Sequence, residues 1–201
     1  MLDGVLSGTV QTARLAARQV MSEIPGSDIR VFDSLTAACP ISGMAMEVLA
    51  YAETGATMDE LEEYLKGLIE RTETYFSVNT LDYLQKGGRI GKVTAMAGTM
   101  LQIKPLITFA ADGQLQSIAK VRGRNLVIRK LIELVTQSHN GAARYNLAVA
   151  NGGAPAEMGV LQGKLTTALP NYDHIWSGEL DGTLSVYIGD GVLGTCVQVL
   201  D

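Results

Sequence analysis

The stretch YFSVNTLDYLQKGGRIGK (75–92) carries most of the information about the fold of this chain. Its first residues predict a short strand over 75–78, and the residues that follow predict a helix over 80–88 that ends at two consecutive glycines. Downstream, an Asp-Gly pair separates two apolar runs, which predicts a hairpin with strands over 103–110 and 115–123. This part of the chain therefore combines antiparallel strands with short helices.

The rest of the second half repeats this mixture. Apolar residues at helical spacing predict helices, and short apolar runs between turn residues predict strands. The helices are expected over 92–102, 125–138 and 155–169, and the strands over 145–151, 174–180, 184–189 and 195–200. We therefore expect an α+β arrangement with a mostly antiparallel or mixed sheet.

The first 74 residues read helix, strand, helix, helix. The helices are expected over 9–22, 41–55 and 57–74, and the strand over 28–34. Thr57 and Glu60 have the spacing of a capping box at the start of the third helix. Because one strand does not complete an α/β layer, we divide the chain into a reduced α/β part over 1–74 and an α+β part over 75–201.

The composition indicates a folded protein without a general nucleic-acid surface. Hydrophobic residues make up 47% of the chain, the net charge is −5 and the pI is about 5.1. No apolar run approaches the roughly 20 residues of a membrane-spanning helix. The beginning of the sequence lacks the basic and apolar regions of a signal peptide, so we expect a cytoplasmic protein with no integral membrane segment.

The cysteines and histidines limit the metal and redox chemistry. Cys39 and Cys196 form no Cys-x-x-Cys pair, and we interpret both as buried, inert thiols. His139 and His174 form no metal-ligand cluster, and neither has an obvious orienting partner for nucleophilic catalysis. We therefore expect no metal site, no cofactor and no catalytic residues.

Three clusters of polar residues could hold an anion. Ser7-Gly8-Thr9 precedes the first helix, where hydroxyls and backbone N–H groups suit a carboxylate, although an ordinary N-cap explains the same residues. The loop KGGRIGK (86–92) surrounds three glycines with basic residues, and KVRGR (120–124) adds three more basic residues; solvated surface explains both equally well. The residues alone thus indicate an anion-binding protein with a large apolar interior.

Taken in order, these motifs resemble the DegV family of bacterial fatty-acid-binding proteins. The matching stretches are LSGTVQTA (6–13), VFDSLTA (31–37), the quoted stretch 75–92, MLQIKPLITFAADGQL (100–115) and KVRG (120–123). The resemblance implies two α/β lobes, with a long-chain fatty acid in an apolar tunnel between them and its carboxylate held by hydroxyls. It also implies that some members present the carboxylate to a separate ATP-dependent fatty acid kinase subunit.

The resemblance assigns roles to individual residues. Ser7, followed by Gly8 and Thr9 in the LSGT motif, matches the serine that contacts the lipid carboxylate. Arg89 matches the arginine of the GGRI motif, which shapes the mouth of the site. Arg122 matches an arginine tied to the phosphorylated head group or to the kinase.

Three departures from the family pattern bear on binding. In VYIGDGVLG (186–194), Tyr187 stands where the family has a histidine, and a tyrosine donates a hydrogen bond without becoming a cation near neutral pH. Asp3-Gly4 replaces a Ser-Ser pair, and Asp3 would repel a carboxylate if it faced the site. Roughly the first third of the family chain has no counterpart here, including a threonine that donates to the carboxylate.

Two functional hypotheses remain. The first is a non-catalytic protein that binds a long-chain fatty acid near Ser7, Arg89, Arg122 and Tyr187. The alternative is a truncated or split interaction module that has lost lipid binding, because uncovered apolar faces favour a homo-oligomer or a partner chain. An enzyme of phosphoryl transfer ranks last, because the sequence contains no ATP-binding motif.

Overall fold

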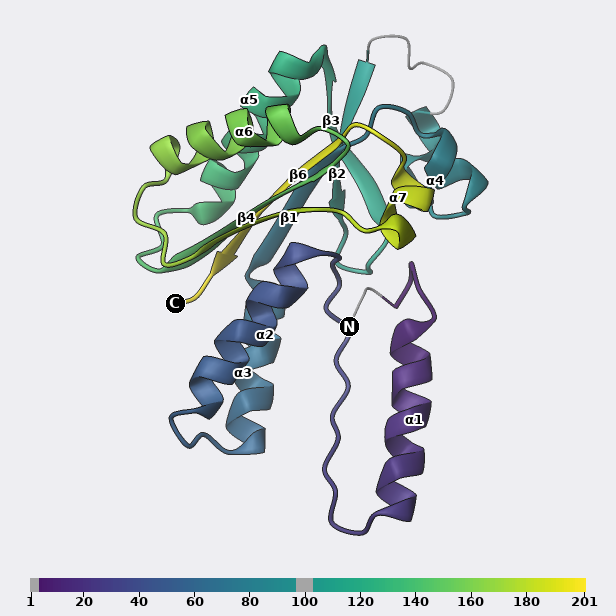
Figure 1. The fold of residues 1–201 in the computed structure, drawn as a ribbon, viewed down its shortest axis with the longest axis vertical. Coiled ribbons are helices and arrows are strands. Elements are labelled where there is room, and N and C mark those ends of the chain that lie inside the picture. Colours follow the sequence, from purple (N-terminus) through teal and green to yellow (C-terminus); the bar gives the residue numbers. More distant parts are fainter. Residues whose placement is uncertain (1–3, 97–102) are drawn as a thin grey trace.

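The computed structural model describes residues 4–96 and 103–201, which form a mixed α/β fold around a six-stranded sheet (Figure 1). The strand order is β3-β2-β1-β6-β4-β5. Neighbouring strands are antiparallel except β4 and β5, which are parallel. The strands are β1 (Thr72–Ser77), β2 (Ile103–Phe109), β3 (Leu115–Arg122), β4 (Tyr145–Gly152), β5 (Ile175–Glu179) and β6 (Val192–Val199). The expected mixed sheet with helices is therefore confirmed.

Helices cover both faces of this sheet. Helices α5 and α6 pack together on one face, whereas α2, α4 and α7 lie on the other, which we call the inner face (Figure 1). The helices are α1 (Thr9–Glu23), α2 (Cys39–Ala52), α3 (Met58–Glu70), α4 (Asp82–Lys86), α5 (Arg124–His139), α6 (Pro155–Ala168) and α7 (Gly182–Ile188). A 3-10 turn over Gly91–Met96 is the described part of the helix expected over 92–102, and 97–102 lie outside the described residues.

The largest hydrophobic core lies between the sheet and helices α5 and α6. Val127, Leu131 and Val135 recur at helical spacing on α5 and are fully buried. Leu161 and Leu165 do the same on α6. Each such side chain stabilises the fold by about 1.5–3 kcal/mol relative to exposure. Strands β4 and β6, which lie over this core, are buried along almost their whole length.

The apolar run over 184–189 predicted a strand, and that prediction is wrong. Most of these residues belong to helix α7 instead. The side chain of Asp181 accepts a hydrogen bond from the amide of Leu184 at 2.9 Å and caps the helix. Leu180, Leu184 and Ile188 recur every fourth residue and turn toward the interior. The N-cap and the helical spacing favour a helix here more strongly than Val186 and Ile188, which are β-branched, favour a strand.

Residues 4–34 form an N-terminal arm that projects from the sheet as α1 and an extended segment (Figure 1). The strand expected over 28–34 is not formed, so that prediction is also wrong. An extended segment becomes a strand only when its backbone pairs with a neighbour, and no strand of the described residues pairs with this one. The arm is instead closed on itself, because the amide of Gly4 donates to Asp33 Oδ2 at 2.9 Å.

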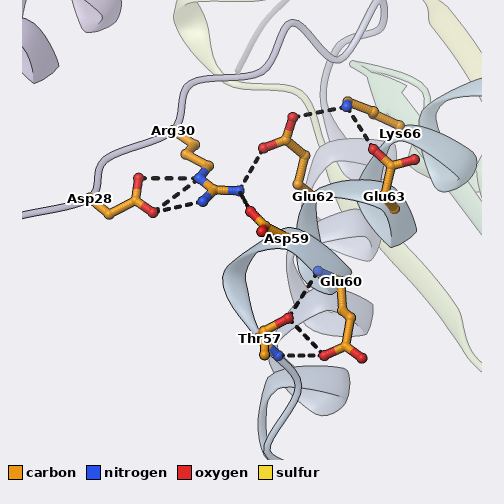
Figure 2. A network of polar contacts seen from close by, with 8 residues as sticks. All are labelled: Asp28, Arg30, Thr57, Asp59, Glu60, Glu62, Glu63 and Lys66. Carbon is orange, nitrogen blue, oxygen red and sulfur yellow. Dashed lines mark hydrogen bonds and ion pairs between the residues drawn. The ribbon is translucent and has the colours of Figure 1, made fainter.

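Arg30 fastens the extended segment of the arm to the start of α3 (Figure 2). Its Nη1 lies 2.7 Å from Asp59 Oδ1 and 2.8 Å from Glu62 Oε2, while Nε and Nη2 contact Asp28. These carboxylates raise the pKa of Arg30, with Asp28 contributing most. Glu62 is shared with Lys66, whose Nζ lies 2.9 Å away. The network therefore holds a segment that has no strand partner.

The expected capping box at the start of α3 is confirmed (Figure 2). Thr57 Oγ1 accepts from the amide of Glu60 at 3.3 Å, and the amide of Thr57 donates to Glu60 Oε2 at 2.7 Å. The helix ends at Glu70 rather than at the expected residue 74. Its last expected residues, 72–74, pair with β6 and begin β1 instead.

We expect Thr57→Ala to lower the free energy of unfolding by about 1 kcal/mol, because the first turn of α3 loses its side-chain acceptor. Urea unfolding followed by circular dichroism measures this loss. Thr136→Ala is the matched control, since the exposed Thr136 hydroxyl bonds only to Ile132 of its own helix. That control should be neutral or slightly stabilising. Equal losses in both variants would contradict a specific role for the cap.

Candidate functional site

A cavity of about 210 Å³ lies on the inner face of the sheet, enclosed by α4, α7, the start of α2 and the tip of the N-terminal arm. Its walls are mostly aliphatic and aromatic. They include Leu6, Phe76, Leu84, Phe109, Leu184 and Ile188. An apolar cavity with few polar groups suits a ligand whose main part is apolar.

The alternation of strand residues builds the floor of this cavity. Successive side chains of a strand point to opposite faces of the sheet. On β6, Leu193 and Val197 enter the core beneath α5 and α6, whereas Gly194 and Cys196 line the cavity. Phe76 of β1 lies beside Gly194 on the same face. One strand therefore serves the core and the cavity at the same time.

Arg89 joins three segments at one end of the cavity. Its Nε donates to the carbonyl of Leu6 at 3.1 Å, and its Nη1 donates to the carbonyl of Gly87 at 2.6 Å. The guanidinium carbon lies 4.6 Å from the centre of the Tyr187 ring, a cation–π contact. Among the described residues no hydrogen bond uses Nη2, which can donate to a ligand. Because Ser7 also lines the cavity, the structure brings Ser7, Arg89 and Tyr187 together.

Ser7 lies immediately before Gly8, the N-cap residue of α1, and beside the cavity. Its hydroxyl accepts from the amide of Thr9 at 3.2 Å and lies 2.7 Å from Thr9 Oγ1, so it satisfies the start of α1. It is also half-buried and lines the cavity. Gly8 and Thr9 are exposed and do not line the cavity. Asp3, which could repel a carboxylate, lies outside the described residues.

The two glycines before Arg89 are needed for different reasons. A Cβ atom on Gly87 would overlap the Tyr187 ring, so only glycine lets the ring lie against the chain there. Gly88 follows the end of α4 with a φ of +71°, a left-handed conformation that favours glycine. The glycine-rich loop therefore approaches a side chain of α7, and that side chain stacks on Arg89.

The remaining basic residues do not join this cluster. Arg122 is exposed at the end of β3 and does not line the cavity, so its assigned role stays a prediction. Lys92 forms an ion pair with Asp112 across 2.6 Å. The structure thus separates these basic groups from Arg89.

The cavity also contains residues that the sequence analysis did not place there, above all the two thiols. Cys39 begins α2, Cys196 lies on β6, and both are free and line the cavity. Burial raises the pKa of Cys196 to about 12 and also raises the pKa of Cys39. Both thiols are therefore protonated near neutral pH and add to the apolar wall. The strand alternation could have placed Cys196, but no local pattern indicates Cys39.

Two other kinds of site were sought in the described part of the chain. Across residues 4–96 and 103–201, His, Cys, Asp and Glu side chains form no group of three or more that could hold a metal ion. Within the same ranges, none of the helices has the length and apolar character needed to cross a membrane.

Comparison with families and relatives gives a consistent match. The model of the family described as "Uncharacterised protein, DegV family" matches residues 1–199. A DegV domain-containing protein of Clostridium perfringens is 31% identical over 193 residues, which make up 96% of this chain and 66% of the relative. The chain therefore spans about two thirds of that relative's length.

Two solved structures have the same fold. The fatty-acid-binding DegV family protein of Thermus thermophilus gives a TM-score of 0.91 at 26% identity, over 99% of this chain and 69% of that one. The Streptococcus pneumoniae Fatty Acid Kinase (Fak) B3 protein, loaded with linoleic acid, gives 0.87 at 23% identity, over 98% and 69%. The second likeness concerns the fold alone.

Gly87→Ala should lower the free energy of unfolding by about 1–3 kcal/mol, because the new methyl group displaces the Tyr187 ring. Gly163→Ala on the exposed face of α6 meets no atom within 4 Å and should stabilise by about 0.5–1 kcal/mol. Urea unfolding measures both changes. The loss should shrink in a Tyr187→Ala background, and an undiminished loss there would contradict this explanation.

Proposed function

Because this chain belongs to the DegV family, we propose that it binds a long-chain fatty acid in the inner-face cavity, with the carboxylate near Ser7 and Arg89. The observation that carries the proposal is the cavity itself. Its walls are apolar over most of their surface, and a hydroxyl, a guanidinium and a phenol gather at one end. That distribution of polarity matches a molecule with one charged head and a long hydrocarbon chain.

The energetics of the two ends support this assignment. Each methylene group that leaves water contributes about 0.8 kcal/mol, so an acyl chain gains most of its binding free energy from the apolar walls. A buried carboxylate costs free energy unless donors satisfy it. Arg89 Nη2 is such a donor, and the Ser7 hydroxyl is another.

Arg89 also positions the other head-group residues. It holds the arm through the carbonyl of Leu6, which precedes Ser7, and it lies against the ring of Tyr187. Tyr187 offers a hydroxyl in the place of the family's histidine. We infer that this end of the cavity neutralises the carboxylate with one cation and two hydroxyls.

We further propose that the chain is non-catalytic and presents the bound acid to a separate ATP-dependent fatty acid kinase subunit in the cytoplasm. The fold of the Streptococcus pneumoniae kinase-associated protein supports this role only at the level of architecture. The exposed Gly8 and Thr9 beside Ser7, and the exposed Arg122, are the residues we propose for contact with that partner. The sequence carries no phosphate-binding loop of its own.

Mass spectrometry of lipid released from the purified, denatured protein tests the binding function directly. We expect a long-chain fatty acid in the released fraction. A protein that is empty, and that also fails to take up added palmitic acid, would overturn the proposal.

Ser7→Ala should weaken palmitic acid binding about tenfold, because a hydrogen bond to a charged group is lost. Ser22→Ala is the matched control, since its exposed hydroxyl bonds only to Gln19 of α1. Isothermal titration calorimetry measures both affinities. Equal affinities for Ser7→Ala and the control would place the carboxylate elsewhere.

A specific observation also keeps the interaction module as a second candidate. Several large apolar side chains are more than half exposed on the N-terminal arm and on α2. They are Val5, Leu15, Ile24, Met46 and Leu49, with exposures of 54–57%. Exposed apolar residues in such number favour self-association or a partner chain.

If these residues mediate self-association, Leu15→Lys with Leu49→Lys should convert an oligomer to a monomer. Light scattering coupled to size-exclusion chromatography measures the mass. Leu126→Lys is the control, because Leu126 is 39% exposed on α5, on the opposite face of the sheet. A wild-type chain that runs as a compact monomer would eliminate self-association.

A further inference from the structure

A second cavity of about 360 Å³ adjoins the apolar one, and its walls are different. It lies where β2 ends beside the first residues of β1. Several of the residues that line it carry a hydroxyl or carboxyl group: Ser34, Thr36, Thr72, Glu73, Thr74 and Thr108. We call this space the polar chamber.

Arg89 and the polar chamber are related to different parts of strand β6. Arg89 lies against Tyr187 of α7, and α7 is followed in the chain by β6, which begins at Val192. Thr74 pairs with Cys196, four residues further along that strand. At about 3.4 Å per residue this separation is roughly 14 Å. An acyl chain whose carboxylate lies at Arg89 therefore points its tail toward Thr74.

A thin partition separates the two cavities. Thr74 and Phe109 line both of them. The hydroxyls of Thr36 and Thr74 lie 3.0 Å apart and form a hydrogen bond across this boundary. The main chain crosses the same boundary, because Ser34 to Thr36 line the chamber whereas Ala37 and Ala38 line the apolar cavity.

The backbone at this crossing adopts an unusual conformation. Leu35 has a φ of +52° and Ala38 a φ of +64°, a left-handed region that non-glycine residues rarely occupy. Ser34 and Thr36 are nevertheless buried, and the Ser34 hydroxyl donates to the carbonyl of Thr36 at 3.2 Å. Strained backbone that is held in place by its surroundings is typical of segments that contact ligands.

The chemistry of the partition favours a polar chain end over a methyl group. Each threonine hydroxyl has one proton and two lone pairs, so the Thr36–Thr74 pair retains acceptor capacity after its mutual bond and the contact of Thr74 with the Cys196 thiol. Thr108 Oγ1 donates to the carbonyl of Thr74 at 2.7 Å and fixes the strand at this point. A methyl group placed here gains nothing from these oxygens, whereas a hydroxyl group donates to one and accepts from another.

We propose that this protein selects fatty acids that carry a hydroxyl group at or near the end of the chain, and that the Thr36–Thr74 pair is the specificity-determining contact. The selection rests on the proposed fatty-acid binding and refines it. Phe109 lines both cavities beside Thr74 and offers an apolar surface to the chain next to the hydroxyl contact.

Calorimetric titration of the whole chain with palmitic acid and with ω-hydroxypalmitic acid tests the proposal. We expect the wild type to bind the hydroxy acid about tenfold more tightly, the effect of roughly one net hydrogen bond. The double variant Thr36→Val with Thr74→Val should lose this preference, so that its affinities for the two acids become equal. The double variant Thr36→Ser with Thr74→Ser retains both hydroxyls and should retain the preference.

The controls distinguish a failure of the hydroxyl selectivity from a failure of fatty-acid binding itself. Thr167→Val, on the exposed face of α6, should leave both affinities unchanged. Binding of palmitic acid with no preference for the hydroxy acid overturns the selectivity and leaves fatty-acid binding intact. A valine variant that weakens both acids equally also overturns it, because that pattern indicates a structural role. Failure of both acids to bind the wild type overturns the proposed function and the selectivity together.

Discussion

The burial of the central strands on both faces is the constraint on which the rest of this structure depends. β4 is buried at every residue and β6 at all but its last. A strand in this position needs apolar cover on two sides. Helices α5 and α6 supply one side as a continuous packed layer. The inner face is covered by separate elements, which are α2, α4, α7 and the N-terminal arm. The cavity lies between these elements and the sheet, where their side chains leave space.

The same piecewise cover explains how the head-group end is assembled. Its residues come from the arm, the loop after α4 and α7, which are far apart in the sequence. Arg89 connects all three through the carbonyls of Leu6 and Gly87 and the ring of Tyr187. Gly87 makes this possible by carrying no side chain where the ring lies. A binding site formed from loops and short helices can thus have a defined geometry when one cation ties its parts together.

Local signals in the sequence predicted the elements that depend on local contacts. The Thr57–Glu60 capping box and the hairpin of β2 and β3 were predicted because their determining residues are neighbours in the chain. The segment over 28–34 has a strand-like pattern, but it forms a strand only if a neighbouring strand pairs with it. Local sequence does not reveal whether such a neighbour is present. In the site, motif resemblance indicated Ser7, Arg89 and Tyr187. Cys39 and Thr74 also line the cavity and were not indicated, because only the tertiary fold brings them there.

Ser7 belongs to the N-terminal arm, which projects from the sheet. Two arginines hold the arm to the rest of the fold, Arg30 on α3 and Arg89 on the carbonyl of Leu6. The Arg30 contacts involve exposed carboxylates, so solvent screens them and they cost little to break. The segment that bears Ser7 is held more firmly at its cavity end, where Leu6 also packs against a hydrophobic cluster of the inner face.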